Sequence, residues 1–214
     1  CNFAELAAAA MLGRRLTPER SPARSRWVAI KAPQFSFSRL QSADPILTVE
    51  MSSTGEVACF GDTVEEAYLK ALLATGFQWP MRGVLLSLGG DENKSGFLQS
   101  AHRLQQLPLP IYATARTAEF LSRHGIATTT LQKMSQAKSP NVREYVQNGS
   151  VDLVVNTSDE EFIHHIRDDY LLRRHAVDCN VPLITNLQAA KLLVNALTTL
   201  RPSDLKPKAW DEYR

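Results

Sequence analysis

Residues able to hold an anion follow five strand-like runs of this sequence. The runs, rich in Val, Ile, Leu and Thr, are 84–88, 111–113, 127–131, 151–155 and 181–185. The residues that follow them include two lysines, several hydroxyls and two amides: Lys94, Thr114, Arg116, Thr117, Lys133, Asn156, Thr157, Ser158 and Asn186. In an open parallel sheet, strand carboxyl ends and the next helix amino termini share one edge, where phosphate-bearing ligands bind. The pattern therefore predicts a small-anion or nucleotide site at that edge.

Taken one at a time, these residues also have ordinary structural roles. Thr114 and Thr117 flank a turn into a helix that starts near Thr117, so their hydroxyls can face one oxyanion, although Thr117 can equally be a plain helix cap. Lys94 is expected in a polar loop, and a loop lysine is usually just solvated. Asn156, Thr157 and Ser158 can simply cap the following segment. Their convergence on one edge favours binding, and the same edge supplies too few acids, bases or nucleophiles to predict catalysis.

A metal site is not expected from the pair His164–His165 and the nearby acids. Adjacent histidines point in different directions on a helix, and no third ligand stands at a suitable spacing. Asp168 and Asp169 are therefore expected at a solvated helix entry. One of Arg173 and Arg174 is expected to pair with Asp169 or Asp178.

The elements that position the candidate residues alternate regularly after residue 82. The expected helices are 95–107, 117–124, 140–148, 168–180 and 187–199. Apolar strands alternating with such helices predict an α/β three-layer sandwich with a five-stranded, mainly parallel sheet, preceded by a small α+β segment. The expected division is a helix and basic loop over 1–26, short β segments and a helix over 27–78, the sheet domain over 82–200, and a tail over 201–214.

Composition limits the possible partners. The chain has 214 residues and is 44% hydrophobic, which is enough for one sizeable core. A net charge of +2 does not favour nucleic acid, and no apolar run approaches the about 20 residues that span a bilayer. Three scattered cysteines predict neither a metal nor a disulfide framework and favour a reducing compartment. The start at Cys1 inside an Ala-rich helical pattern suggests a piece of a longer polypeptide.

Several stretches together resemble one enzyme family. In the sheet domain they are Lys94-Ser95, Thr114-x-x-Thr117, Asn148 to Asn156, Arg173 to Asp178 and Val181 to Asn186; before it they are Ala32 to Leu40, Ala43 to Pro45 and Glu50 to Val57. They resemble the end of the second synthetase half of carbamoyl-phosphate synthetase and its C-terminal regulatory domain, which has the methylglyoxal-synthase-like fold. The resemblance covers nearly the whole chain from about residue 27.

The resemblance implies a regulatory role. The full-length enzyme makes carbamoyl phosphate from bicarbonate, ammonia and two ATP, with Mg²⁺, for pyrimidine or arginine synthesis. Its ATP and metal ligands precede this segment, so the chain is expected to hold no cofactor and no catalytic residue. Implied partners are the rest of the synthetase chain, a glutaminase subunit or domain, and an effector such as UMP, UTP, IMP or phosphoribosyl pyrophosphate. A cytoplasmic location is expected, with a mitochondrial one as the alternative.

The effector class is read from a few positions. In nucleotide-controlled members, the resemblance implies phosphate contacts from Lys94, Thr114, Thr117 and Lys133, with Asn156 and Ser158 toward the ribose or base. Arg116 stands where bacterial members often have Gly. Members activated by N-acetylglutamate have Trp at the Lys133 position and Asn at the Asp159 position, so a phosphate-bearing effector is favoured. An N-acetylglutamate domain, a methylglyoxal-synthase-type lyase and a scaffold without effector binding remain alternatives.

Overall fold

The structure is a computed structural model that describes residues 2–16, 26–34, 37, 40, 42–46, 55–136, 138–158 and 163–213. Its central element is a five-stranded sheet in the order β5-β4-β3-β6-β7, in which every neighbouring pair is parallel. The strands are β3 (Val84–Leu88), β4 (Ile111–Thr114), β5 (Thr129–Leu131), β6 (Leu153–Thr157) and β7 (Leu183–Ile184). All residues of the central strands β3 and β6 are buried, as their continuous apolar runs predict.

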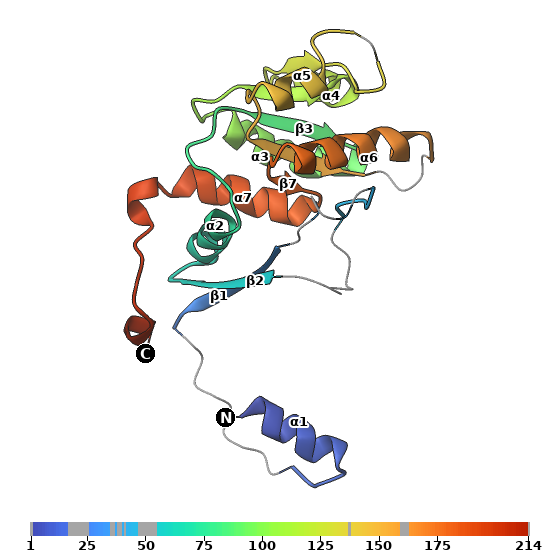
Figure 1. The fold of residues 1–214 in the computed structure, drawn as a ribbon. Helices are drawn as coiled ribbons and strands as arrows, with labels where there is room; N and C mark the ends of the chain where they lie inside the picture. Colours follow the sequence, from blue (N-terminus) through green and yellow to red (C-terminus); the bar gives the residue numbers. More distant parts are fainter. Residues whose placement is uncertain are drawn as a thin grey trace.

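Helices cover both faces of the sheet (Figure 1). They are α3 (Asp91–Leu104), α4 (Ala115–Arg123), α5 (Val142–Gln147), α6 (Ile163–Asp178) and α7 (Leu187–Thr199). Leu86 of β3 packs in one core cluster with Phe97 of α3 and Leu193 of α7. Leu85, its neighbour on the opposite face, packs in a second cluster that includes Leu172 of α6. The predicted three-layer α/β sandwich is confirmed.

The start of α3 differs from the sequence prediction. A polar loop was expected up to residue 94, but α3 begins at Asp91, directly after Gly90. Gly90 has a φ of 69°, which glycine adopts without steric cost, so the chain turns from β3 straight into the helix. Asp91 and Glu92 then lie in the first turn, where the helix dipole favours negative charge. The loop assignment of Lys94 was therefore wrong, because this residue is helical.

Two more helix starts were predicted too late. α4 begins at Ala115 with Thr114 as its N-cap residue, so Thr117 lies inside the first turn and is not the cap. α6 begins at Ile163, before the expected start at 168. The expected range 187–199 is confirmed for α7.

A smaller unit precedes the sheet. Strands β1 (Val28–Gln34) and β2 (Gly55–Gly61) pair antiparallel, and α2 (Val64–Ala74) follows, capped by the Thr63 hydroxyl. Figure 1 shows α2 beside α7. Leu69 of α2 and Phe77 belong to the same core cluster as Leu193 of α7, so the apolar core of the sheet domain extends to residues before 82.

The two ends of the chain differ in how they pack. After the short helix Pro202–Asp204, the C-terminal helix Trp210–Tyr213 returns to the small unit, where the Tyr213 ring lies 5.3 Å from Phe60. Helix α1 (Phe3–Met11) has no buried residue. Among the described residues, no helix is long and apolar enough to cross a membrane.

Candidate functional site

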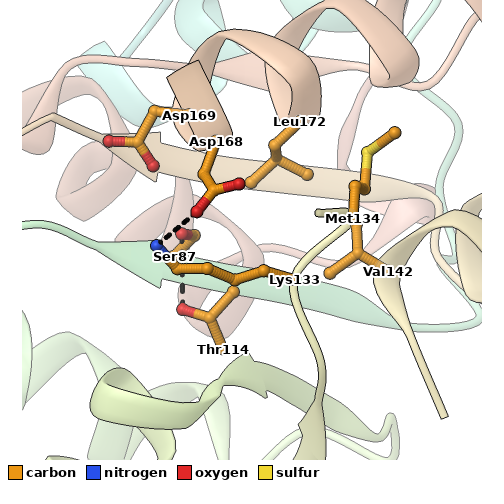
Figure 2. A pocket seen from close by; sticks show the side chains of 8 residues that line it. All are labelled: Ser87, Thr114, Lys133, Met134, Val142, Asp168, Asp169 and Leu172. Atoms are coloured by element: carbon orange, nitrogen blue, oxygen red, sulfur yellow. Dashed lines mark hydrogen bonds and ion pairs between the residues drawn. The ribbon is translucent and has the colours of Figure 1, made fainter. Parts of the chain in front are cut away.

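A small pocket lies at the carboxyl ends of β3 and β4 (Figure 2). Its lining combines hydroxyls, a lysine, two carboxylates and three apolar side chains: Ser87, Thr114, Lys133, Met134, Val142, Asp168, Asp169 and Leu172. The pocket measures about 10 Å³, which is room for about one water molecule. A larger ligand therefore requires side chains at the pocket to move.

Lys133 and Asp168 face each other in the pocket. The Lys133 Nζ lies 3.0 Å from the Asp168 Oδ2, and the two side chains are 25% and 19% exposed. Lys133 comes from the segment after β5, whereas Asp168 comes from α6. Because the pair is partly buried, water and salt screen the attraction between its two charges less than they would in a surface pair. An anion approaching Lys133 therefore has to compete with a carboxylate.

Hydroxyl groups form the floor beneath this ion pair. The Thr114 hydroxyl lies 3.3 Å from the Ser87 hydroxyl and 3.4 Å from the Thr117 hydroxyl. Both contacts are long, so they hold Thr114 weakly. Thr117 is 1% exposed, and its Oγ1 accepts a hydrogen bond of 3.0 Å from the Leu88 N–H. Thr114 lines the pocket, while Thr117 fixes the end of β3 next to it.

Lys94 lies in the first turn of α3, with its side chain 10% exposed. Its Nζ lies 2.9 Å from the Asp91 Oδ1, and the Asp91 side chain is 92% exposed. The hydrogen bond from Lys94 and its charge, with a smaller effect from Arg116, hold the pKa of the Asp91 carboxyl below its usual value. Lys94 and Arg116 thus form a second cationic group at the same edge of the sheet, centred on Asp91.

Asn156 and Ser158 are tied into a third group. Asn156 is fully buried, and its Nδ2 donates to the Ser87 carbonyl and to Asp169 Oδ1, both at 3.2 Å. Arg173 donates to the Asn156 Oδ1 at 2.9 Å and to the Ser158 hydroxyl at 2.8 Å. Asn156 therefore touches the floor and one wall of the pocket, but its hydrogen-bonding groups are already engaged.

The two remaining candidates lie apart from the pocket lining. Thr157 is 3% exposed, and its hydroxyl has no hydrogen-bond partner among the described residues. Asn186 is exposed and caps α7 by accepting a hydrogen bond from the Ala189 N–H. The structure therefore brings Thr114 and Lys133 into one pocket and places the other candidates around it along the edge.

Sequence reasoning missed three partners of the candidate residues. Asp168 was treated as part of a solvated helix entry, yet it lies in the pocket and is mostly buried. Arg173 was given no partner beyond the α6 acids, of which Arg174 takes Asp178, and its carboxylate partner is Asp44. Ser87 was read only as a strand residue. The spacing along α6 gave a partial indication that Asp168 faces inward. Asp168 and the apolar Leu172 are four residues apart and therefore share a helix face.

Two further sequence predictions concern charged groups. The pairing of Arg174 with Asp178 is confirmed, with Arg174 Nε 3.0 Å from the Asp178 Oδ1. The described residues contain no group of three potential metal ligands, while the side chains of His164 and His165 and the whole of Asp159 lie outside the description.

The parallel-sheet part of the chain is similar to a known protein family. A family model described as "MGS-like domain" matches residues 96–185, which include α4 to α6 and the pocket residues contributed by β4, the segment after β5, and α6. The chain carries an MGS-like domain.

The relatives extend the comparison to most of the chain. The chain is 43% identical over 209 residues to the multifunctional protein URA2 of Saccharomyces cerevisiae, covering 92% of this chain and 9% of that protein. It is 37% identical over 217 residues to the human mitochondrial carbamoyl-phosphate synthase [ammonia], covering 96% and 14%. It is 39% identical over 206 residues to the multifunctional protein CAD of Squalus acanthias, covering 90% and 9%. These similarities place the MGS-like domain of this chain in the carbamoyl-phosphate synthase family.

The chain spans roughly a tenth of the length of the curated relatives that it matches. Among solved structures, the chain is similar to methylglyoxal synthase from Elizabethkingia anophelis, with a TM-score of 0.41, 13% identity, and coverage of 53% of this chain and 77% of that one.

Proposed function

We propose that the MGS-like domain of this chain is the effector-binding domain of a carbamoyl-phosphate synthase, and that its effector carries a phosphate. The observation that carries the proposal is the pocket itself, where Lys133 and the Thr114 hydroxyl meet at the carboxyl edge of a parallel sheet. Such an edge is the usual place for phosphate-bearing ligands in open α/β sheets. Lys94 adds a second cation in the first turn of α3, near the positive end of the helix dipole.

The charges of the described residues support a phosphate more than a dicarboxylate. Asp168 and Asp169 both line the pocket, so an anionic ligand needs enough charge and acceptor oxygens to compete with Asp168 for Lys133. A multiply charged phosphate can bridge Lys94 and Lys133 through several oxygens, and charge-assisted hydrogen bonds contribute about 1.5–3 kcal/mol each. An N-acetylglutamate carboxylate has fewer acceptor oxygens with which to displace Asp168 from Lys133.

The proposal includes the biological setting. The longer protein makes carbamoyl phosphate from bicarbonate, an ammonia donor and ATP, and the effector bound here adjusts its rate. The names of the relatives are consistent with this setting, since one is a carbamoyl-phosphate synthase and two are multifunctional proteins. Catalysis is assigned to the remainder of the polypeptide, outside this chain.

A thermal-shift screen with UMP, UTP, IMP, phosphoribosyl pyrophosphate and N-acetylglutamate tests the proposal. At least one phosphate-bearing compound should raise the melting temperature in proportion to the logarithm of its concentration, because a ligand that binds only the folded state stabilises it. Lys133→Ala should reduce this shift. Lys138→Ala, which removes an exposed lysine from the same loop, should leave it unchanged. Stabilisation by N-acetylglutamate alone would contradict the phosphate assignment.

A further inference from the structure

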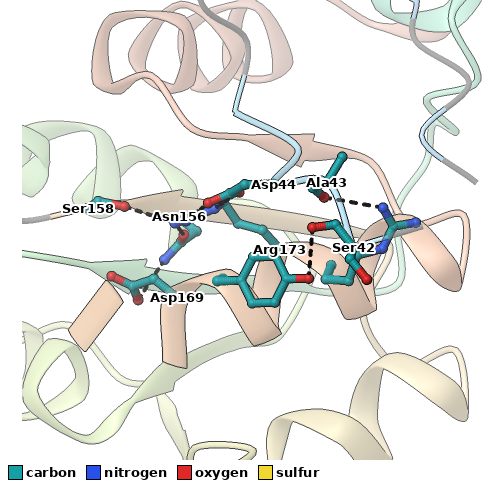
Figure 3. A network of polar contacts seen from close by, with 9 residues as sticks. Ser42, Ala43, Asp44, Asn156, Ser158, Asp169 and Arg173 are labelled. Carbon is teal, nitrogen blue, oxygen red and sulfur yellow. Dashed lines mark hydrogen bonds and ion pairs between the residues drawn. The ribbon is translucent and has the colours of Figure 1, made fainter. Parts of the chain in front are cut away.

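The buried guanidinium of Arg173 joins two parts of the chain that are far apart in the sequence (Figure 3). Its side chain is 2% exposed, and its carboxylate partner is Asp44, 129 residues away. Arg173 Nε donates to Asp44 Oδ1 at 2.7 Å, and Nη2 donates to the other carboxylate oxygen. This two-pronged geometry fixes both the position and the plane of the guanidinium.

The other side of the same guanidinium faces the candidate site. Arg173 Nη1 donates to the Asn156 Oδ1 and to the Ser158 hydroxyl. Because the Asn156 oxygen is held by Arg173, its amide nitrogen must point toward Ser87 and Asp169, which both line the pocket. Asp44 is thus linked to the pocket through two side chains, although it does not line the pocket itself.

Neighbouring side chains of α6 hold the same segment in a different way. Arg174 donates to the carbonyls of Phe37, Leu40 and Ala43, and the Tyr170 hydroxyl donates to the Ser42 carbonyl at 3.1 Å. The hydrogen bonds described for these two side chains do not reach Asn156 or Ser158. They anchor the segment, whereas Arg173 alone of the three has described hydrogen bonds to both the segment and the pocket side.

We propose that Arg173 is a positioning residue that couples occupation of the effector site to the segment around Asp44. This inference rests on the proposed function for its ligand, although the network itself exists without one. A buried arginine charge tolerates the loss of its carboxylate poorly, so movement of Asp44 changes how Arg173 holds Asn156 and Ser158. By thermodynamic reciprocity, a ligand that displaces Asn156 or Ser158 changes the hold of Arg173 on Asp44.

The network is tested first without any ligand. The variant Asp44→Asn should shift the side-chain amide signals of Asn156 in NMR spectra of the chain. The matched control is Asp62→Asn, which removes a carboxylate paired with Lys208 at 3.2 Å in the same small unit, and it should leave these signals in place. Unchanged Asn156 signals in folded Asp44→Asn would overturn the inference, whatever the effector proves to be.

The coupling is tested next with UTP as the probe, by calorimetry and hydrogen exchange. Arg173→Lys keeps the charge but loses the two-pronged geometry, and it should weaken UTP binding about fivefold or more. Tyr170→Phe, which removes one hydrogen bond to the segment, should bind UTP normally. Saturating UTP should also change the hydrogen exchange of residues 42–46 in the wild-type chain, and much less in Arg173→Lys.

The outcomes separate the two claims. If UTP and the other phosphates fail to bind the wild-type chain, the proposed effector site fails, while the NMR comparison still decides the network. If UTP binds with equal affinity to wild type and Arg173→Lys and leaves residues 42–46 unchanged, the positioning role fails and the effector site stands. Tighter binding by Arg173→Lys would also contradict the positioning role.

Discussion

Lys94 and Lys133 stand at the same edge of the sheet, but the structure restrains them in different ways. Lys94 is held by its own helix, three residues from its partner Asp91, whose side chain is 92% exposed. Lys133 is held across elements by Asp168, whose side chain is 19% exposed. Water screens the first pair strongly and the second pair weakly. Lys94 therefore keeps most of its attraction for a ligand, whereas Lys133 has to exchange one anion for another.

This difference suggests separate roles for the two lysines. Lys94 provides a fixed cation whose position does not depend on distant parts of the chain. The availability of Lys133 depends on the position of α6, because movement of that helix carries Asp168 with it. The same helix carries Arg173, so the state of α6 affects the pocket from two sides.

The largest effect on effector affinity is expected from Lys94→Met. Methionine keeps the apolar stem packed but removes the charge that is least offset by its own partner. Binding of the best phosphate ligand should weaken about tenfold to a hundredfold, measured by calorimetry at fixed ionic strength. Lys191→Met, which removes a lysine on α7, serves as the control and should bind normally. Equal affinity of Lys94→Met and wild type would exclude Lys94 from the site.

A smaller loss of affinity, about tenfold, is expected from Lys133→Ala. A ligand that binds Lys133 must first separate it from Asp168, and the free energy of that separation offsets part of the gain. The comparison with Lys138→Ala controls for the loss of one positive charge in this loop. A larger loss in Lys133→Ala than in Lys94→Met would reverse the proposed ranking of the two lysines.

The carboxylate partners provide the opposite test. Asp168→Asn removes the competitor from the pocket and should strengthen phosphate binding by about fivefold. Asp91→Asn removes a solvent-exposed partner and should change the affinity by less than about twofold. Both variants are followed by the same titration. If Asp168→Asn weakens binding, Asp168 contacts the ligand instead of competing with it.

The smallest effect on affinity is expected from the hydroxyls. Thr114→Val should weaken binding only about threefold, since a single hydrogen bond contributes about 0.5–1.5 kcal/mol. Thr117→Val should instead lower the free energy of unfolding by about 1–3 kcal/mol, because it removes the buried acceptor of the Leu88 N–H. Urea unfolding and titration of both variants would separate the two roles. A stable Thr117→Val that loses binding would place Thr117 in the site itself.

The sheet could be predicted from the sequence because its signals are local. Continuous apolar runs such as residues 84–88 are typical of strands buried on both faces, and the alternation with helices predicts a parallel arrangement. The edge location of Thr114 and Lys133 follows from that topology. Helix starts were harder to predict. A glycine such as Gly90 is equally common in a polar loop and in a tight turn that leads directly into a helix, and the composition does not distinguish the two.

The partners of the site residues could not be predicted in the same way. Which carboxylate of α6 faces Lys133 depends on the rotation of that helix against the sheet, and both Asp168 and Asp169 were available. The pair between Arg173 and Asp44 joins residues 129 positions apart, so no local pattern indicates it. The sequence therefore predicts which residues lie at this edge of the sheet, but the packing of the helices determines which of their side chains are in contact.

A crystal structure of the chain with its best phosphate-bearing effector tests the central claim most directly. The account predicts phosphate oxygens within hydrogen-bond distance of both Lys94 and Lys133, near the Thr114 hydroxyl, with the Lys133–Asp168 pair opened. The phosphate bound elsewhere, with the Lys133–Asp168 pair intact, would contradict the account.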